Sequence, residues 1–230
     1  MKVILAKKAG FCMGVRRAVE ATLETVQQSD KKIATFGPLI HNPQVLSLLE
    51  ERGVEVLDAI PERFSGVVII RAHGVPPGQK AALRHSGAEV KDATCPRVVK
   101  VQAIIKRHKK DACFTVIIGD KNHAEVIGLM GYAEPEVAVV SCLADIDQLD
   151  ITGPYIIVSQ TTQDDDSFNE LSTRITQKFP GGKVFNTICD STHKRQHEVR
   201  ILCDEVEAVV VVGGKTSANT KRLAEIAEKK

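Results

Sequence analysis

Three of the six cysteines stand in one recurring local setting, where a short apolar run gives way to an expected helix. Cys12 follows VILA, Cys95 follows AEVKDAT and Cys189 follows KVFNTI. Each lies in a different third of the chain, so three small lobes could bring the thiols to one point. Thiols that converge in this way are typical of a metal or cluster site.

Iron–sulfur chemistry suits these thiols better than zinc does. Zinc sites favour paired C-x-x-C spacings, and the sequence contains no such pair. Three isolated thiolates suit a [4Fe–4S] cluster with one iron left open, because most such clusters have four cysteine ligands. A helix N-terminus is expected to lower the pKa of each thiol. Cys113, Cys142 and Cys203 are interpreted as buried packing residues.

A second group of polar residues follows other expected strands, at or before a helix start. It comprises His41, His73, His123, Thr161, Ser217, Ala218 and Asn219. Helix N-termini bind anions, so a small oxygen-rich anion is expected, with phosphate or diphosphate the first choice. The commoner roles stay open: Thr161 or Asn219 could be a helix cap, and a lone histidine is usually structural.

Glu125 is the one carboxylate that we expect in this pocket. Burial would raise its pKa and keep it protonated as a proton donor. The ordinary alternative is a capping or surface glutamate. Gly213 and Gly214 resemble a phosphate loop, but neither G-x-x-x-x-G-K-[ST] nor G-x-G-x-x-G is present.

Alternating strands and helices must position these residues, which indicates an α/β fold with parallel sheets. The apolar runs are continuous, as in strands that are buried on both faces. Strands are expected near residues 2–6, 32–36, 67–71, 89–93, 113–119, 155–159, 183–187 and 208–212. The acidic stretch 164–166 is expected to begin a helix.

Composition narrows the class of protein. The chain has 230 residues, 43% apolar and 26% charged, with a formal charge of +2, as in globular proteins. The small charge, the absence of tryptophan and 4% aromatic residues argue against a nucleic-acid partner. The apolar runs are too short to span a membrane, and no leader precedes the first strand. We therefore expect a cytoplasmic protein with reduced cysteines.

Several motifs in order resemble one family. They are GFCMGVRRAV, GPLIHNPQV, IIRAHGVPP, DATCPRV, KNHAEVIG, SQTT and GGKTSANTKRL. Together they resemble the LytB/IspH family of 4-hydroxy-3-methylbut-2-enyl diphosphate reductases, from residue 3 to about residue 225. That resemblance implies the last step of the non-mevalonate isoprenoid pathway. The C4 hydroxyl of an allylic diphosphate is removed with two electrons and two protons, giving isopentenyl and dimethylallyl diphosphate.

The resemblance also implies a role for each matching residue. Cys12, Cys95 and Cys189 would hold the [4Fe–4S] cluster, whose open iron faces the substrate. The diphosphate would be bound by His41, His73, His123, Ser217, Ala218 and Asn219. Thr161 would bond the C4 hydroxyl, with Glu125 in the proton path. A ferredoxin- or flavodoxin-type protein would supply electrons.

The family fold implies three small parallel-sheet α/β lobes in a pseudo-threefold cloverleaf around the cluster. The expected lobes are residues 13–95, residues 96–188, and residues 1–12 with 189–230.

Two departures keep alternatives open. Many members have serine or glycine where this chain has Ala218, which offers only its backbone N–H. Members also continue with a further strand, loop and helix, so we expect a truncated third lobe here. The alternatives are a fragment that binds a cluster or diphosphate without turnover, and another three-lobed [4Fe–4S] enzyme such as a quinolinate synthase.

Overall fold

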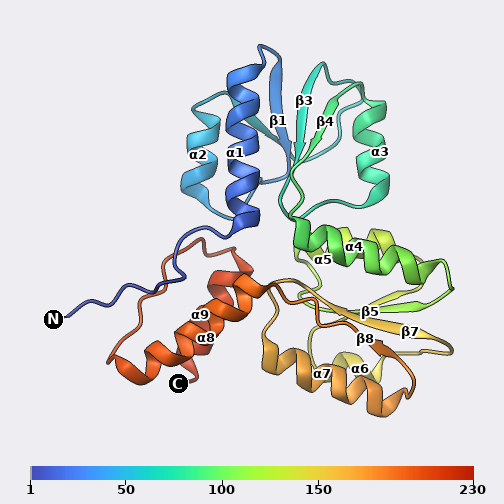
Figure 1. Ribbon diagram of the computed structural model, residues 1–230. Helices are drawn as coiled ribbons and strands as arrows, with labels where there is room; N and C mark the ends of the chain where they lie inside the picture. The colour runs from blue at the N-terminus through green and yellow to red at the C-terminus, as the bar shows by residue number, and fades with distance from the viewer. Residues whose placement is uncertain (1) are drawn as a thin grey trace.

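Buried β-branched runs form the centres of two parallel sheets in the computed structural model, which describes residues 2–230 (Figure 1). Strands β3 (Gly66–Ile70) and β7 (Tyr155–Ser159) are buried at all five positions. Helices cover both faces of each sheet, which explains why these runs are apolar throughout. The prediction of an α/β fold with parallel sheets is confirmed.

The first sheet has the strand order β2-β1-β3-β4, and every neighbouring pair is parallel. Its other strands are β1 (Lys32–Phe36), β2 (Val54–Leu57) and β4 (Glu89–Asp92). Helices α1 (Met13–Gln28) and α2 (Pro43–Glu50) pack on one face, and α3 (Pro77–His85) packs on the other.

The second sheet repeats this topology with the order β6-β5-β7-β8, again all parallel. Its other strands are β5 (Phe114–Ile118), β6 (Val137–Val140) and β8 (Lys183–Val184). One face is covered by α4 (Pro96–Lys109) and α5 (Ala124–Ala133), and the other by α6 (Leu143–Asp147) and α7 (Asp165–Lys178).

The repeated strand order explains where the polar loops lie. In each sheet the chain leaves the two central strands toward opposite faces, which opens a crevice at their carboxyl ends. His41 follows β1 and His73 follows β3, while His123 follows β5 and Thr161 follows β7. The fourth strand of each sheet leads to a cysteine, so Cys95 follows β4 and Cys189 follows β8.

Residues 2–230 form two parallel sheets and no third one, so the third parallel-sheet lobe stays a prediction. Residues 2–6 and 208–212 were expected to be strands, but neither segment is one. A strand needs a neighbour to take its backbone hydrogen bonds, and no ladder forms with either segment. Their apolar side chains consequently lie in solvent: Leu5 is 82% exposed and Val212 is 91% exposed.

The helices expected after those two segments are present, because α1 follows residues 2–6 and α9 follows residues 208–212. Helix α8 (Asp190–Glu205) and helix α9 (Ala218–Glu228) pack against each other beside the second sheet (Figure 1). The division into three lobes at the stated boundaries stays a prediction, and its residue 1 lies outside the described range. No helix formed by residues 2–230 combines the length and apolar character that a membrane crossing requires.

Candidate active site

Three imidazole rings from three loops lie against one another. The ring centroids of His41 and His73 are 4.6 Å apart, and that of His123 lies 5.7 and 5.3 Å from them. His41 precedes α2, His73 lies between β3 and α3, and His123 is the N-cap of α5. The sequence therefore predicted three residues that the fold brings together, although one comes from a different sheet.

The environment keeps the three rings uncharged at neutral pH. Burial is the main cause that lowers the pKa of each, and it brings the pKa of His123 to about 4. Neighbouring rings and the Arg71 guanidinium add to the effect, because each positive charge opposes another. The pKa of His73 is lowered well below its usual value. The rings are thus neutral hydrogen-bonding groups.

The histidine cluster also resembles a metal site, since one ring nitrogen from each residue lies within 4.8 Å of the others. The hydrogen bonding of His123 favours an anion instead. Its Nδ1 accepts the backbone N–H of Glu125 at 3.2 Å, which leaves the ring proton on Nε2 as a donor. His73 Nδ1 is buried without a partner among residues 2–230, so a bound ligand would satisfy it.

Glu125 and Thr161 form a buried pair beside this cluster. The Thr161 backbone N–H donates to Glu125 Oε1 at 2.6 Å, and the Thr161 hydroxyl donates to Oε2 at 2.7 Å. Glu125 is only 2% exposed. Burial raises its pKa to about 7, even though both hydrogen bonds act in the opposite direction. The predicted raised pKa is confirmed, and Thr161 is not a simple helix cap.

Thr161 also connects this acid to the cysteine region through its carbonyl. That oxygen accepts the backbone N–H of Cys189 at 2.9 Å and the hydroxyl of Thr192 at 3.1 Å. Thr192 is buried one turn into α8. Sequence reasoning missed Thr192, because its partner lies 31 residues earlier in the chain. A displacement of α8 would therefore also move Thr161, which bonds Glu125.

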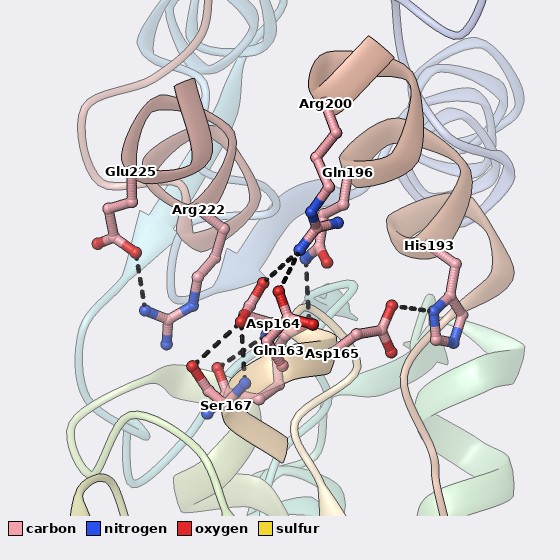
Figure 2. A network of polar contacts seen from close by, with 10 residues as sticks. Gln163, Asp164, Asp165, Ser167, His193, Gln196, Arg200, Arg222 and Glu225 are labelled. Atoms are coloured by element: carbon pink, nitrogen blue, oxygen red, sulfur yellow. Dashed lines mark hydrogen bonds and ion pairs between the residues drawn. The ribbon is translucent and has the colours of Figure 1, made fainter. Parts of the chain in front are cut away.

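A polar network holds α7 and α8 together beyond this bond (Figure 2). Arg200 pairs with Asp164 at 3.2 Å and with Asp166 at 3.0 Å, and His193 bonds Asp165. Asp164 caps α7 by accepting the backbone N–H of Ser167 at 3.0 Å, which confirms the acidic stretch as a helix start. The helix that begins after Cys189 is thus fixed to the loop that carries Thr161.

Helix α9 brings the last group of predicted residues toward the histidines. Ser217 is its N-cap and accepts the Thr220 backbone N–H at 3.3 Å, while Ala218 and Asn219 form the first turn. Gly214 lies so close to the His41 carbonyl that any side chain there would collide with it. Arg222 pairs with Asp120 of the β5–α5 loop at 2.7 Å. Sequence reasoning did not find this ion pair, which joins α9 to the second sheet.

The three predicted cysteines are all helix N-caps. Cys12 precedes α1, Cys95 precedes α4 and Cys189 precedes α8, and none of the three side chains makes a cap hydrogen bond. A methyl group added at Gly14 would lie 2.5 Å from Cys95 Sγ, so α1 packs directly on that thiol.

Further contacts join the helices that bear these thiols. Arg97 of α4 pairs with Asp190 of α8, next to Cys95 and Cys189 respectively. The Cys95 backbone N–H donates to the Ala72 carbonyl at 2.9 Å, beside His73. The backbone of Cys95 is therefore bonded to the loop that carries His73.

The thiols fit a group that carries positive charge. Burial raises the pKa of the Cys95 thiol, and the nearby Cys12 and Cys189 thiols raise it further. The expected lowering of its pKa is therefore wrong for Cys95 without a cation. Iron ions would reverse that effect, because a coordinated thiol loses its proton. All six cysteines are free, so this trio fits a cluster with three thiolate ligands.

The other cysteines were interpreted as buried packing residues, and Cys142 corrects that view. Cys142 is exposed, and Cys113 and Cys203 are half-buried. Cys142 is also a helix N-cap, of the short helix α6. The position at a helix start therefore does not distinguish the site cysteines, whereas their convergence does.

Comparison with known proteins gives one consistent result. The sequence profile of the family described as LytB protein matches residues 3–230. A 4-hydroxy-3-methylbut-2-enyl diphosphate reductase of Treponema denticola is 40% identical over 99% of this chain, which covers 83% of that protein. The reductase of Pelobacter propionicus is 42% identical over 98% of the chain, which covers 80% of it. The chain thus spans about four-fifths of these relatives.

Solved structures agree with the sequence relatives. A structure titled as (E)-4-hydroxy-3-methyl-but-2-enyl diphosphate reductase, the terminal enzyme of the non-mevalonate pathway, has a TM-score of 0.78 at 40% identity and covers 99% of this chain and 82% of that one. A Plasmodium falciparum reductase structure has a TM-score of 0.91 at 29% identity over 96% of this chain and 71% of that one. The profile match, these identities and the shared fold together make the chain a member of the LytB protein family.

Proposed function

We propose that the chain is a 4-hydroxy-3-methylbut-2-enyl diphosphate reductase, the last enzyme of the non-mevalonate isoprenoid pathway. In this reaction the C4–O bond of the allylic diphosphate breaks, and two electrons and two protons give water with isopentenyl and dimethylallyl diphosphate. The observation that carries the proposal is the role of Thr161, which bonds Glu125 on one side and Cys189 on the other. A buried carboxyl group and the backbone of a proposed cluster ligand are thus bonded to the same threonine.

The histidine cluster is proposed to bind the diphosphate. Neutral rings can donate N–H bonds to phosphate oxygens without the cost of burying three positive charges. Ser217, Asn219 and the Ala218 backbone N–H would add donors from the start of α9, where the helix dipole also favours an anion. Neighbouring Arg71 supports this role, because its guanidinium supplies a permanent positive charge.

Glu125 is proposed to deliver a proton toward the C4 oxygen through Thr161. With a pKa of about 7 it holds its proton in part of the molecules at neutral pH, as a general acid requires. A protonated Glu125 would donate to the Thr161 hydroxyl, which then directs its own hydrogen toward the substrate. The buried setting also excludes bulk water from this proton path.

Cys12, Cys95 and Cys189 are proposed to hold a [4Fe–4S] cluster. When bound, such a cluster supplies electrons and a Lewis-acidic iron to the substrate. The backbone bond of Cys189 to Thr161 and the Arg97–Asp190 ion pair between α4 and α8 support this role. We further propose that the chain belongs to a three-lobed cloverleaf, works in the reducing cytoplasm and receives electrons from a ferredoxin- or flavodoxin-type protein.

A second candidate function is a protein that binds a cluster or diphosphate without turnover. The missing third sheet favours it, because residues 2–6 and 208–212 lack strand neighbours. Another three-lobed [4Fe–4S] enzyme such as a quinolinate synthase is disfavoured, since the family profile covers residues 3–230.

Anaerobic reconstitution separates these candidates. The chain should then bind iron and sulfide and convert the allylic diphosphate with a chemical reductant. Cys189→Ser should lose iron and activity, whereas Cys203→Ser is a matched control in the same helix and should keep both. A cluster without turnover would favour the second candidate, and an iron-free wild-type protein would exclude the cluster.

Replacing Glu125 by Gln tests the acid alone. Gln can accept the Thr161 backbone N–H and donate to the Thr161 hydroxyl, so both bonds persist. We expect turnover to fall by about 100-fold, the usual scale of a lost general acid. Iron content and diphosphate affinity should stay at the wild-type level, and full activity would remove Glu125 from the proton path.

A further inference from the structure

Four basic side chains surround a shallow hollow of about 270 Å³ on the surface beside Cys12. They are Lys7, Lys8, Lys194 and Arg195, and we name them the basic groove. Cys12 forms part of its lining, between Phe11 and Met13. These two apolar side chains are 43% and 52% exposed. The hollow therefore combines an apolar centre with a positive rim, directly over a proposed cluster ligand.

Hydrogen bonds hold the groove in shape while leaving its lysine charges free. Glu198 of α8 accepts the backbone N–H groups of Lys7 at 2.6 Å and Lys8 at 2.8 Å. Arg195 donates to the carbonyls of Lys8 at 3.0 Å and Gly10 at 2.6 Å. The N-terminal segment is thus fixed to α8 without any strand.

The lysine ammonium groups have no partner of their own. Those of Lys7, Lys8 and Lys194 form no ion pair anywhere in residues 2–230. Glu198 is the one carboxylate bound to the segment, so positive charge remains in excess in the basic groove.

We propose that the basic groove is the docking surface of a small acidic one-electron carrier protein; the inference rests on the proposed reductase function. Each docking event oxidises the carrier and reduces the site by one electron, so each turnover needs two such events. A carrier that must leave and return needs a short-lived complex, and complementary charge gives fast association without high affinity. A small apolar centre with a charged rim fits such a transient interface.

The position of Cys12 explains why the carrier would dock here. Cys12 is only half-buried and precedes α1 in the surface hollow. Glu125 and Thr161 are buried, in contrast, and belong to the substrate side of the site. Electrons would therefore enter through the Cys12 surface while the substrate occupies the histidine side. This separation lets the carrier and the substrate bind at the same time.

Charge reversal tests the proposal. The variant Lys7→Glu/Lys194→Glu changes two groove residues whose side chains form no hydrogen bond or ion pair with any other residue of the range 2–230. Its matched control is Arg107→Glu/Lys110→Glu, which changes the net charge equally at the far end of α4, about 20 Å along that helix from Cys95. An acidic [2Fe–2S] ferredoxin that is reduced by NADPH and its reductase serves as the carrier, and dithionite with methyl viologen serves as the chemical reductant.

Four readouts decide the outcome. We expect kcat/KM for the ferredoxin to fall by about 10-fold or more in the groove variant at low salt, with the chemical-reductant rate unchanged. The ferredoxin dissociation constant should rise by a similar factor, and added salt should weaken the wild-type complex. An equal loss in the control, a loss with the chemical reductant or an unchanged dissociation constant would each overturn the proposal.

Two further results are also interpretable. Tighter binding of a DNA oligonucleotide than of ferredoxin would assign the basic groove to nucleic acid and overturn the proposal. If the wild-type protein reduces substrate with neither electron source, the proposed function fails. The dissociation constants, which require no turnover, then decide the docking surface by themselves.

Discussion

Thr161 makes four hydrogen bonds that join Glu125 of α5 to the start of α8. Its backbone N–H and hydroxyl bond the two oxygens of Glu125, and its carbonyl accepts from Cys189 and Thr192. The pattern SQTT indicated a polar loop, but it could not reveal four simultaneous bonds. Those bonds come from residues on α5 and α8, so they arise only when the second sheet and α8 are in place.

Thr161→Val should change the pH dependence of turnover. The hydroxyl bond lowers the pKa of Glu125, whereas burial raises it to about 7. Removing the hydroxyl while keeping the shape should therefore raise the pKa further. The pH at which turnover falls, because Glu125 loses its proton, should therefore move upward. The maximal rate should also drop, because the hydroxyl of the proposed proton path is gone. A kcat–pH profile measures this change, with Thr161→Ser as the control that keeps the hydroxyl.

Helix starts are the elements that assemble the site. Sequence patterns placed the central strands correctly, because runs such as VVII and YIIV are apolar at every position. The edge strands β2 (VEVL) and β6 (VAVV) were missed; both have only four residues, and β2 interrupts its apolar residues with a glutamate. The prediction for residues 2–6 and 208–212 was wrong in the opposite way, because strands were expected there and none is formed. They have strand-like composition, but pairing is a long-range property that the local sequence does not contain.

Gly14→Ala tests how closely α1 must approach the Cys95 thiol. The added methyl group would lie 2.5 Å from Sγ, far inside van der Waals contact, although alanine suits a helix. We expect iron content after reconstitution to fall severalfold while the far-ultraviolet circular dichroism stays unchanged. Gly78→Ala in α3 is the matched control, since nothing lies within 4 Å of its new methyl group. Equal iron content in both variants would contradict the steric argument.

At the scale of the whole molecule, one repeated strand order accounts for most of the site. The orders β2-β1-β3-β4 and β6-β5-β7-β8 place two loops from each sheet at one crevice and one cysteine after each fourth strand. The proposed substrate-binding residues and the cysteines therefore come from equivalent positions in the two sheets. Loops in equivalent positions carry different residues, so the histidine cluster receives two rings from the first sheet and one from the second.

Neutral buried histidines should make the whole fold sensitive to acid. The pKa of His123 is about 4 in the folded protein and about 6.5 when unfolded, so the unfolded chain binds more protons between these values. Stability from this residue is therefore full above about pH 6.5 and is lost as pH falls toward 4. At pH 5 the loss should reach about 1–2 kcal/mol.

Urea unfolding of the cluster-free chain at pH 7.5 and pH 5 measures that loss, with His123→Asn as the comparison. Asparagine is a good N-cap and does not titrate, so the variant should keep the start of α5 while losing less stability in acid. The raised pKa of Glu125 acts with the opposite sign, because its contribution is present below about pH 4.5 and is lost as pH rises through about 7. Both proteins contain Glu125, so the difference between them isolates the histidine. Equal acid losses would mean that His123 is already solvated or charged in the folded protein.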